Sequence, residues 1–261
     1  MSKPVPLPLD VRLMNITATV LFAACAVLLV AALGWWAVRH PAFAIRGIVV
    51  QGELAHNSAA TLRANVAPRL AGNFFTLDLE KARAAFEAVP WVRKAVVRRQ
   101  FPNKLRVVLE EQKAEALWGA DSESRLVNGF GEVFEANPGE VETEEMPRFV
   151  GPDGTAPQVL AMYRSLVPLL QPLELGIEEV VLSGRGGWTL HTDSGAVVEL
   201  GRGTAEEVLA RSERFAQTLT QVTSKYNRRP EALVTADLRH ADGYAVKLRG
   251  VVTTDVAAKR N

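Results

Sequence analysis

The sequence has only one cysteine, Cys25, in 261 residues, and it lies inside a long apolar run. Residues beyond this run cannot form a disulfide with one another, so the stability of any domain there has to come from burial of apolar side chains. Histidines are also few, and no two have the spacing of metal ligands: His40, His56, His191 and His240. We therefore expect no metal site.

Net charge is nearly absent as well. The 30 Lys and Arg residues are balanced by 29 Asp and Glu residues, which leaves a net charge of +1. Nucleic-acid-binding proteins usually carry a clearly basic face, so no nucleic-acid partner is expected. The chain contains no low-complexity tract and no repeat of fixed period.

Motifs of catalysis and cofactor binding are missing too. The segment "GRGTAEE" (201–207) lacks the third glycine of a dinucleotide-binding loop and the G-K-[ST] of a P-loop, so no cofactor is expected. Ser183 and Ser194 lie in predicted turns near His191, but no G-x-S-x-G elbow accompanies them. We expect no small-molecule substrate and no enzymatic activity, and a hydrolase with an unrecognised nucleophile is kept as an alternative.

The longest uncharged run is the most informative feature that is present. The 23 residues 16–38 contain no Asp, Glu, Lys, Arg or His. As a helix they would extend about 35 Å, enough to cross a hydrocarbon core of about 30 Å. A cleaved signal would have a shorter apolar core, and a buried helix of this length would usually contain a charge. The run predicts a membrane anchor, with these lipid-facing residues: Val20, Leu21, Phe22, Leu28, Leu29, Val30, Leu33, Trp35 and Trp36.

The numbers of basic residues on the two sides of the run are nearly equal and do not assign an orientation: Lys3 and Arg12 precede it, and Arg39 and Arg46 follow it. The length of chain on either side decides the orientation, because a long following domain translocates largely regardless of its charge. We expect residues 1–15 to be a cytoplasmic tail and the body of the chain to lie outside.

Residues 43–118 form the first expected domain beyond the anchor. Apolar periodicity predicts a strand over 43–52, helices over 57–70 and 79–89, a strand over 91–101 and a further strand from Lys104, whose apolar residues alternate. Asn57 or Ser58 would cap the first helix and Asp78 the second. The β-α-α-β-β order is that of a POTRA domain, a small α+β module.

A basic run crosses the last two strands of this domain: Arg93, Lys94, Arg98, Arg99, Lys104 and Arg106. Two interpretations stay open. The run is either the solvated side of two adjacent strands or a contact site for an acidic partner or anionic lipid.

Residues 125–250 form the second expected domain, followed by a tail over 251–261. The patterns predict a hairpin over 126–136, a short strand near Phe149, three strands within 177–201 and a closing hairpin around Ala241-Asp242-Gly243. Two helices are expected. One, over 156–173, is kinked or shortened by Pro168; the other, over 204–223, begins with a Thr204–Glu207 capping box and carries the stripe Val208, Phe215, Leu219 and Val222. The fold class is therefore α+β, with a mainly antiparallel sheet covered on one face.

The last strand of such a sheet often lies at an edge, where its free N–H and C=O groups can pair with another chain. Alternation would place Tyr244, Val246 and Leu248 on one face and Ala245, Lys247 and Arg249 on the other.

Four blocks of sequence resemble the FtsQ/DivIB family of bacterial cell-division proteins, in the family's order. They are "PWVRKAVVRRQFPNKLRVVLEEQKAEALW", "LVNGFGEVFEA", "FVGPDGTAPQVLAMYRSL" and "VTADLRHADGYAVKLR". The resemblance covers about residues 12–250 and includes the expected architecture of tail, single span, POTRA domain and second β-rich domain.

This resemblance implies a non-enzymatic divisome scaffold in the inner membrane at the division septum, with its bulk in the periplasm. Its C-terminal strand would bind the periplasmic segments of FtsB and FtsL, its POTRA domain would contact other divisome proteins, and septal peptidoglycan synthesis would come under its influence. Arg239 and Gly243 match family positions, whereas His240 and Leu248 depart from family aromatics, and Tyr244 offers a nearby ring. The expected partner-binding residues are Arg239, His240, Gly243, Tyr244, Ala245, Val246, Lys247, Leu248 and Arg249.

The main alternative is a POTRA-containing component of an outer-membrane assembly or secretion machine. Such a protein would need many uninterrupted amphipathic strands after the POTRA domain, and here two predicted helices interrupt them.

Overall fold

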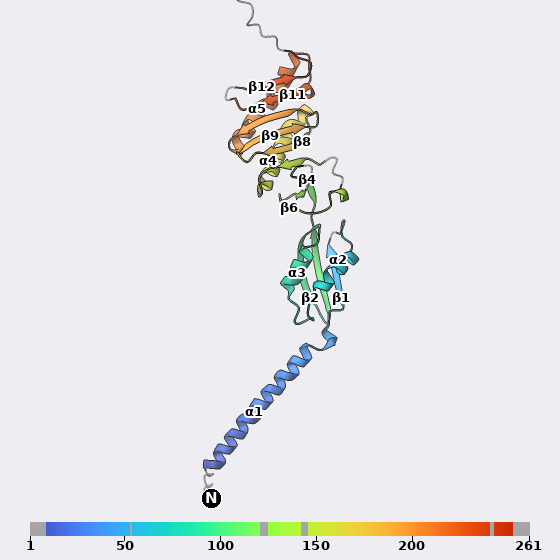
Figure 1. Ribbon diagram of the computed structural model, residues 1–261, viewed down its shortest axis with the longest axis vertical. Coiled ribbons are helices and arrows are strands. Elements are labelled where there is room, and N and C mark those ends of the chain that lie inside the picture. Colours follow the sequence, from blue (N-terminus) through green and yellow to red (C-terminus); the bar gives the residue numbers. More distant parts are fainter. Residues whose placement is uncertain (1–8, 53, 121–124, 142–145, 241–242, 253–261) are drawn as a thin grey trace, which may run out of the picture. The chain divides into compact units, whose positions relative to one another are not determined.

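A computed structural model describes residues 9–52, 54–120, 125–141, 146–240 and 243–252 (Figure 1). It divides into two compact units, Met1–Glu111 and Gln112–Asn261. Three predicted features fall partly outside the described residues, namely the N-terminal tail over 1–8, the turn at Ala241–Asp242 and the tail over 253–261.

Helix α1, Leu9–Val38, contains the predicted span and begins before it, so that Asp10 and Arg12 lie in its first turns. None of its residues is buried, and among the described residues it is the one helix long and apolar enough to cross a membrane. The hydroxyls of Thr17 and Thr19 donate to backbone carbonyls four residues earlier, at 2.8 and 2.7 Å. These side chains therefore need no water, as an anchor requires.

The first unit continues with a three-stranded sheet and two helices in the predicted β-α-α-β-β order. Its sheet order is β1-β3-β2, with β1 parallel and β2 antiparallel to β3. The elements are η1 Pro41–Phe43, β1 Gly47–Gly52, α2 Ala59–Val66, η2 Ala67–Arg69, α3 Leu79–Glu87, β2 Val92–Gln100 and β3 Lys104–Glu111.

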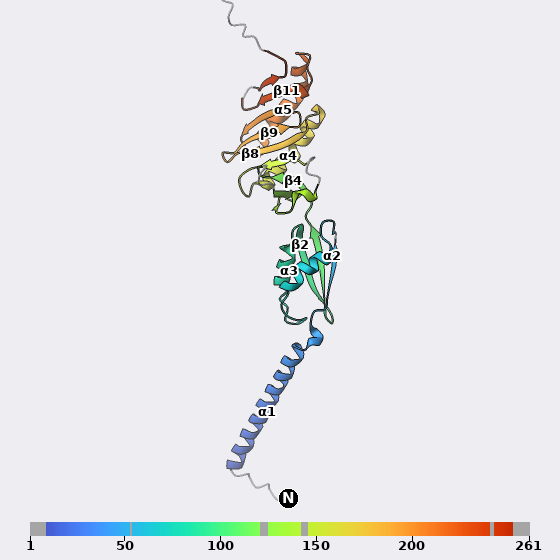
Figure 2. The same cartoon turned by 45° about the vertical axis from the view of Figure 1, so that its right-hand side comes forward.

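Both helices of this unit lie beside the sheet (Figure 2), and their buried side chains form one cluster with those of the strands. Leu62 and Phe86 from the helices are fully buried against Leu105 and Val107 of β3, which point to the same side because strand side chains alternate. Ser58 and Asp78 cap α2 and α3 with their side-chain oxygens. The helix predicted over 57–70 ends at Val66 and tightens into a 3₁₀ turn, because Pro68 has no N–H to continue the α-helical ladder.

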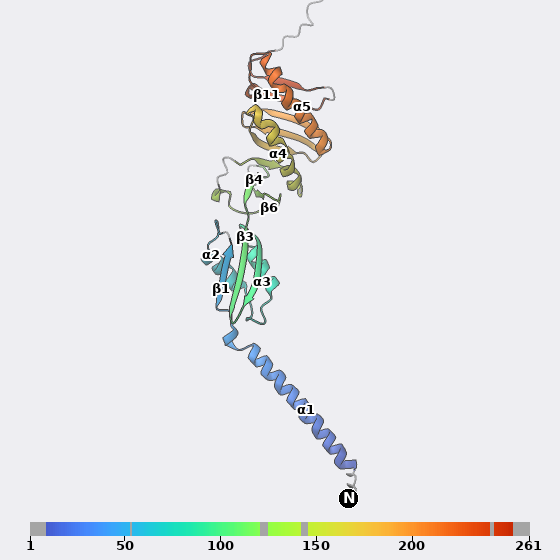
Figure 3. The same cartoon turned by 180° about the vertical axis from the view of Figure 1, so that it is seen from behind.

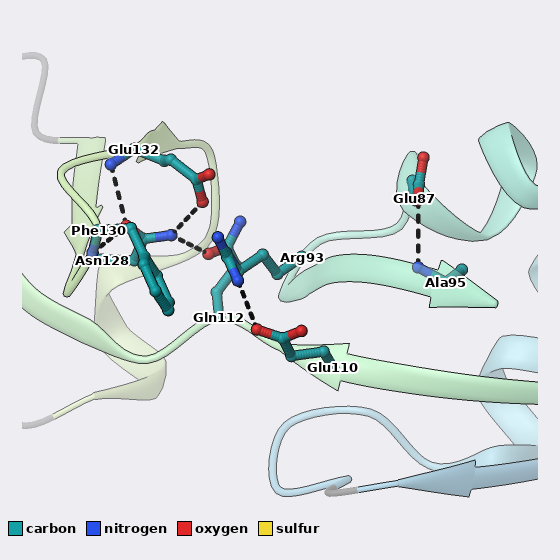
Figure 4. A network of polar contacts seen from close by, with 8 residues as sticks. All are labelled: Glu87, Arg93, Ala95, Glu110, Gln112, Asn128, Phe130 and Glu132. Atoms are coloured by element: carbon teal, nitrogen blue, oxygen red, sulfur yellow. Dashed lines mark hydrogen bonds and ion pairs between the residues drawn. The ribbon is translucent and has the colours of Figure 1, made fainter.

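The basic run is only partly solvated. Arg93 forms an ion pair with Glu110 across the β2–β3 ladder (Figure 4). Arg99 donates to the carbonyls of Phe74 and Leu77, both at 2.6 Å, and so fastens the loop before α3 to the sheet. The remaining four cations of the run are exposed: Lys94, Arg98, Lys104 and Arg106.

The second unit contains one sheet of nine strands, in the order β12-β11-β10-β9-β8-β7-β4-β5-β6. Sequence analysis placed residues up to 118 in the first domain, but β4 pairs with β5 and β7 and therefore belongs to this sheet. The elements are β4 Ala114–Trp118, β5 Arg125–Asn128, β6 Val133–Phe134, η4 Pro138–Glu140, β7 Arg148–Val150, α4 Ala156–Leu170, η6 Gln171–Leu173, β8 Ile177–Leu182, β9 Gly187–Thr192, β10 Val197–Arg202, α5 Ala205–Ser224, η7 Pro230–Ala232, β11 Leu233–Asp237 and β12 Ala245–Leu248.

Both long helices connect parallel strands rather than antiparallel ones. Helix α4 joins β7 to β8 and α5 joins β10 to β11, and each of these strand pairs is parallel. A parallel pair needs a crossover connection, which a helix supplies. The two helices contact each other and cover one face of the sheet (Figure 3), so the single covered face predicted from the sequence is observed.

Local details of the helices follow the sequence closely. Helix α4 ends two residues after Pro168, and the capping box between Thr204 and Glu207 is present. On α5, Thr223 is fully buried while Val222 is partly exposed, which corrects the predicted stripe by one position. The Thr223 hydroxyl donates to the Thr220 carbonyl, so its burial leaves no unsatisfied donor.

The hairpin between β5 and β6 is held by one buried amide. The oxygen of the Asn128 side chain accepts from the N–H groups of Phe130 and Glu132, each at 2.9 Å, and its nitrogen donates to Gln112 and Glu132 (Figure 4). Both ends of the amide are thereby satisfied, which fixes the turn.

Glu111, the last residue of β3, provides a test of the first unit. Its buried carboxylate accepts backbone N–H groups of Ala55, His56 and Asn57 at 2.7, 3.2 and 3.1 Å. Glu111→Ala would leave these donors without an acceptor, and we expect a loss of roughly 2–4 kcal/mol in the free energy of unfolding, measured by urea titration. Glu111→Gln keeps one acceptor oxygen and should lose less; equal losses would contradict this role.

Candidate partner-binding edge

Strand β12 is the outermost strand of the nine-stranded sheet. It pairs with β11 in antiparallel register, with Ala245 opposite Asp237 and Lys247 opposite Thr235. In the part of the chain that the structure describes, no strand pairs with its other side. The predicted edge position is therefore observed.

Two hydrogen bonds show which backbone groups of β12 point outward. The Arg249 N–H donates to the Ala232 carbonyl at 2.7 Å, and the Leu238 N–H donates to Glu199 on β10 at 2.9 Å. The Arg249 N–H therefore points toward the sheet. Because the direction of backbone groups alternates along an antiparallel strand, the N–H and C=O of Lys247 and Ala245 also point toward β11. Those of Val246, between them, point away from the sheet. Val246 thus offers a donor and an acceptor at the open edge.

Side chains of β12 alternate as predicted. Leu248 is buried and Tyr244 and Val246 are half-buried on the helix side, while Ala245, Lys247 and Arg249 are exposed. The Tyr244 ring packs edge-on against Phe215 of α5, and its hydroxyl lies 2.7 Å from the hydroxyl of Thr218. Helix α5 therefore fixes the start of the edge strand.

Two hollows border β12 on this helix side. The first, of about 220 Å³, is lined by Arg211 and Arg214 of α5 together with Gln217, Thr218, Leu238, Gly243 and Tyr244. The guanidinium of Arg211 donates to the carbonyls of Leu200 and Arg202. The second lies at the other end of the strand and combines apolar side chains with Tyr226 and Lys247; its apolar lining residues are Val222, Val246, Leu248, Val251 and Val252. A segment paired with β12 would meet a hollow lined by two arginines at one end and a hollow of mixed polarity at the other.

Arg239 is held at the end of β11 by a bidentate ion pair. Its Nε and Nη2 donate to the two oxygens of Asp237 at 2.8 and 2.6 Å. These hydrogen bonds hold the pKa of the Asp237 carboxyl well below its ordinary value. The stem of Arg239 lies close to Gly201, whose φ of 82° and lack of a side chain leave room for it.

The exposed His240 lies 3.9 Å from the same carboxylate, beyond hydrogen-bond distance. Gly243 has open space around its Cα, and a side chain there would meet no neighbour. The predicted residues thus gather around one strand. The sequence analysis did not identify Asp237, Arg214 and Thr218, although Asp237 lies two residues before Arg239.

The serines considered as nucleophiles have structural roles. Ser183 Oγ accepts from the Gly187 N–H at 2.8 Å, and Ser194 Oγ lies 2.9 Å from the Thr192 hydroxyl. Each hydroxyl supports the hairpin turn in which it lies.

These features define a class of protein: a chain whose described residues include one apolar helix long enough to span a membrane, a POTRA domain, and a second α+β domain whose sheet ends in an open strand. Comparison with known proteins supports this class. Residues 43–112 match the family model described as POTRA domain, FtsQ-type, and residues 116–239 match that of Cell division protein FtsQ/DivIB, C-terminal.

Curated relatives extend over nearly the whole chain. The chain is 43% identical to a Cell division protein FtsQ of Burkholderia pseudomallei over 93% of its length and 94% of the relative's. It is 38% identical to proteins of the same name from Thiomonas arsenitoxydans, over 95% and 91%, and Bordetella pertussis, over 92% of each. The chain belongs to the FtsQ/DivIB family of cell-division proteins. The family resemblance noted in the sequence is thereby confirmed, and the apolar α1 is that of a membrane-anchored member.

The ion pair of Asp237 can be tested by its titration. In the wild-type protein, carbon NMR of labelled aspartate carboxyls should show Asp237 titrating well below the ordinary pKa of an aspartate, because Arg239 stabilises its charged form. Arg239→Ala should raise this pKa toward the ordinary value, and Arg249→Ala, which removes an exposed arginine nearby, should not. An unchanged midpoint in Arg239→Ala would refute the pairing.

Proposed function

We propose that this protein is a non-enzymatic scaffold of the divisome that binds the periplasmic part of FtsB, paired with FtsL, by strand addition at β12. The observation that carries the proposal is the open edge of β12, which lies where the family resemblance expects the partner. By linking early and late division proteins in this way, the chain would help control septal peptidoglycan synthesis.

The proposed setting is the inner membrane at the division septum. The short N-terminal tail would lie in the cytoplasm, and both folded units would lie in the periplasm, because a long domain after a single span translocates largely regardless of its charge. Binding at the membrane needs no cofactor, metal or small-molecule substrate, in keeping with the proposed scaffold role.

The two hollows beside β12 suggest the chemistry of the partner segment. Backbone pairing supplies affinity but little selectivity between partner sequences, so side chains have to set the register of the partner's strand. Arg214 in the first hollow favours an acidic side chain, and the valine and leucine side chains that line part of the second favour a hydrophobic one. Because β12 is short, we propose that these two side chains fix the register of the partner's strand.

The POTRA domain is the proposed contact for other divisome proteins. Its sheet order leaves β1 and β2 as outer strands, and β2 is nine residues long. A long outer strand favours contact with an extended segment.

Val246→Pro tests strand addition directly. Proline removes the outward N–H of Val246 but no hydrogen bond to β11, so the domain should fold and the edge should lose a donor. We expect the dissociation constant for the FtsB periplasmic segment to rise about tenfold or more, measured by isothermal titration calorimetry.

The matched control is Val246→Thr, which keeps both the β-branched shape and the N–H. It should bind clearly more tightly than Val246→Pro, because it keeps the outward N–H and only replaces one methyl group in the lining of the second hollow by a hydroxyl. Thermal unfolding of both variants reports on the fold. Wild-type affinity in a folded Val246→Pro variant would rule out pairing at this edge.

Arg214→Gln tests the first hollow. It should weaken binding several-fold, with a loss that shrinks at high salt because a charge pair is removed. Lys225→Gln neutralises an exposed cation just beyond the same helix, away from the hollow, and should leave affinity unchanged. Equal effects of the two changes would indicate general attraction rather than a specific contact.

A further inference from the structure

Four phenylalanines gather at one end of the POTRA domain. Phe75 packs edge-on against Phe43 with ring centres 4.9 Å apart, and Phe74 packs against Phe75 and Phe101 at 5.3 and 6.0 Å. Phe74 is buried and Phe43 half-buried, but Phe75 is 47% and Phe101 74% exposed. We call Phe43, Phe74, Phe75 and Phe101 the aromatic tip.

The aromatic tip is assembled by backbone and arginine contacts rather than by chance proximity. The Phe74 N–H donates to the Phe43 carbonyl at 2.8 Å, and the Arg46 N–H donates to Asn103 at 2.9 Å. Arg99 holds the Phe74 carbonyl from the sheet. These contacts connect three loops, which lie before β1, before α3 and between β2 and β3. The rings of Phe75 and Phe101 remain exposed.

This end of the domain is also the end nearest the span. Phe43 follows the last residue of α1, Val38, by five positions. Five residues reach at most about 18 Å when fully extended. The aromatic tip therefore lies within reach of the membrane surface whatever the orientation of the domain.

Charge is distributed unevenly along the domain. The segments that meet at the tip, 39–47, 70–77 and 98–104, contain five Arg or Lys and no Asp or Glu, and Asp78 follows directly after them as the cap of α3. Glu110 and Glu111 lie at the opposite end of β3. Aromatic rings flanked by an excess of cations match the interfacial region of a bilayer that contains anionic lipid.

We propose that the aromatic tip rests in the interface of the membrane that α1 spans, with Phe75 and Phe101 among the headgroups and Lys104 and Arg46 beside anionic lipid. The domain is then attached at two points, the span and the tip. This contact limits how far the POTRA domain swings about the short connection after Val38.

The experiment uses the full chain in nanodiscs of phosphatidylcholine, alone or in an equimolar mixture with phosphatidylglycerol. Cys25→Ala removes the native thiol, and Ala71→Cys, an exposed position in the loop before the tip, carries an environment-sensitive fluorophore. Quenching by lipid with a headgroup nitroxide reports contact with the interface. We expect strong quenching at residue 71, stronger with phosphatidylglycerol, and weak quenching of a label at Ala88→Cys beyond α3.

Phe75→Ser combined with Phe101→Ser should lower quenching at residue 71 by about half or more, because two interfacial rings are lost. Val96→Ser with Val108→Ser is the matched control, since these valines are 47% and 42% exposed on the same sheet but away from the tip. Lys104→Gln should reduce the gain from phosphatidylglycerol, and Lys94→Gln should not.

Circular dichroism on each variant separates loss of contact from loss of fold. Unchanged quenching in the folded Phe75→Ser and Phe101→Ser protein, or an equal drop in the valine control, would overturn the proposal.

Discussion

Backbone hydrogen bonding is the constraint on which the proposed activity depends. Among the described residues, every strand of the large sheet except the outermost ones is paired on both sides, and β12 is paired on one side only. An unpaired row of N–H and C=O groups is ordinarily a hazard, because it can pair with any extended chain. Here the row is short, bordered by the exposed Lys247 and Arg249, and fixed from behind by the contact of Tyr244 with Phe215 and Thr218. A rigid, short and charged edge suits a selective partner better than indiscriminate pairing.

Much of the fold could be predicted because its elements carry strong local signals. The capping residues Asp78 and Thr204, the alternation along β3 and the uncharged run of α1 each depend on neighbouring residues alone. Two features did not follow from local pattern. Assignment of β4 to the second sheet depends on its pairing with β5 and β7, and the parallel crossovers of α4 and α5 depend on the order of strands in space. Periodicity indicates that a strand exists but not which strand lies beside it.

The residues of β12 itself could be predicted from the sequence, but the residues of other elements that surround the strand could not. Alternation of Tyr244, Val246 and Leu248 gave the faces of β12 correctly, because a period of two is a property of the strand itself. The residues that shape the surroundings of the strand come from elsewhere. Arg214 and Thr218 lie on α5, more than twenty residues earlier, and reach β12 only because the crossover returns the chain beside β10. Asp237 was overlooked although it is close in sequence, because a bidentate bond to Arg239 depends on side-chain geometry.

The order of strands from β7 to β12 follows the order of the chain, so each strand joins the edge left by its predecessor. Sheet growth of this kind brings together segments that are near in sequence, which keeps the entropy of loop closure low. Each strand from β8 to β12 thus lies beside its predecessor in the chain, and the described series stops at β12. A strand supplied by the proposed partner would continue this order and become the tenth strand of the sheet. The proposed complex would in this sense extend the domain's own sheet in trans.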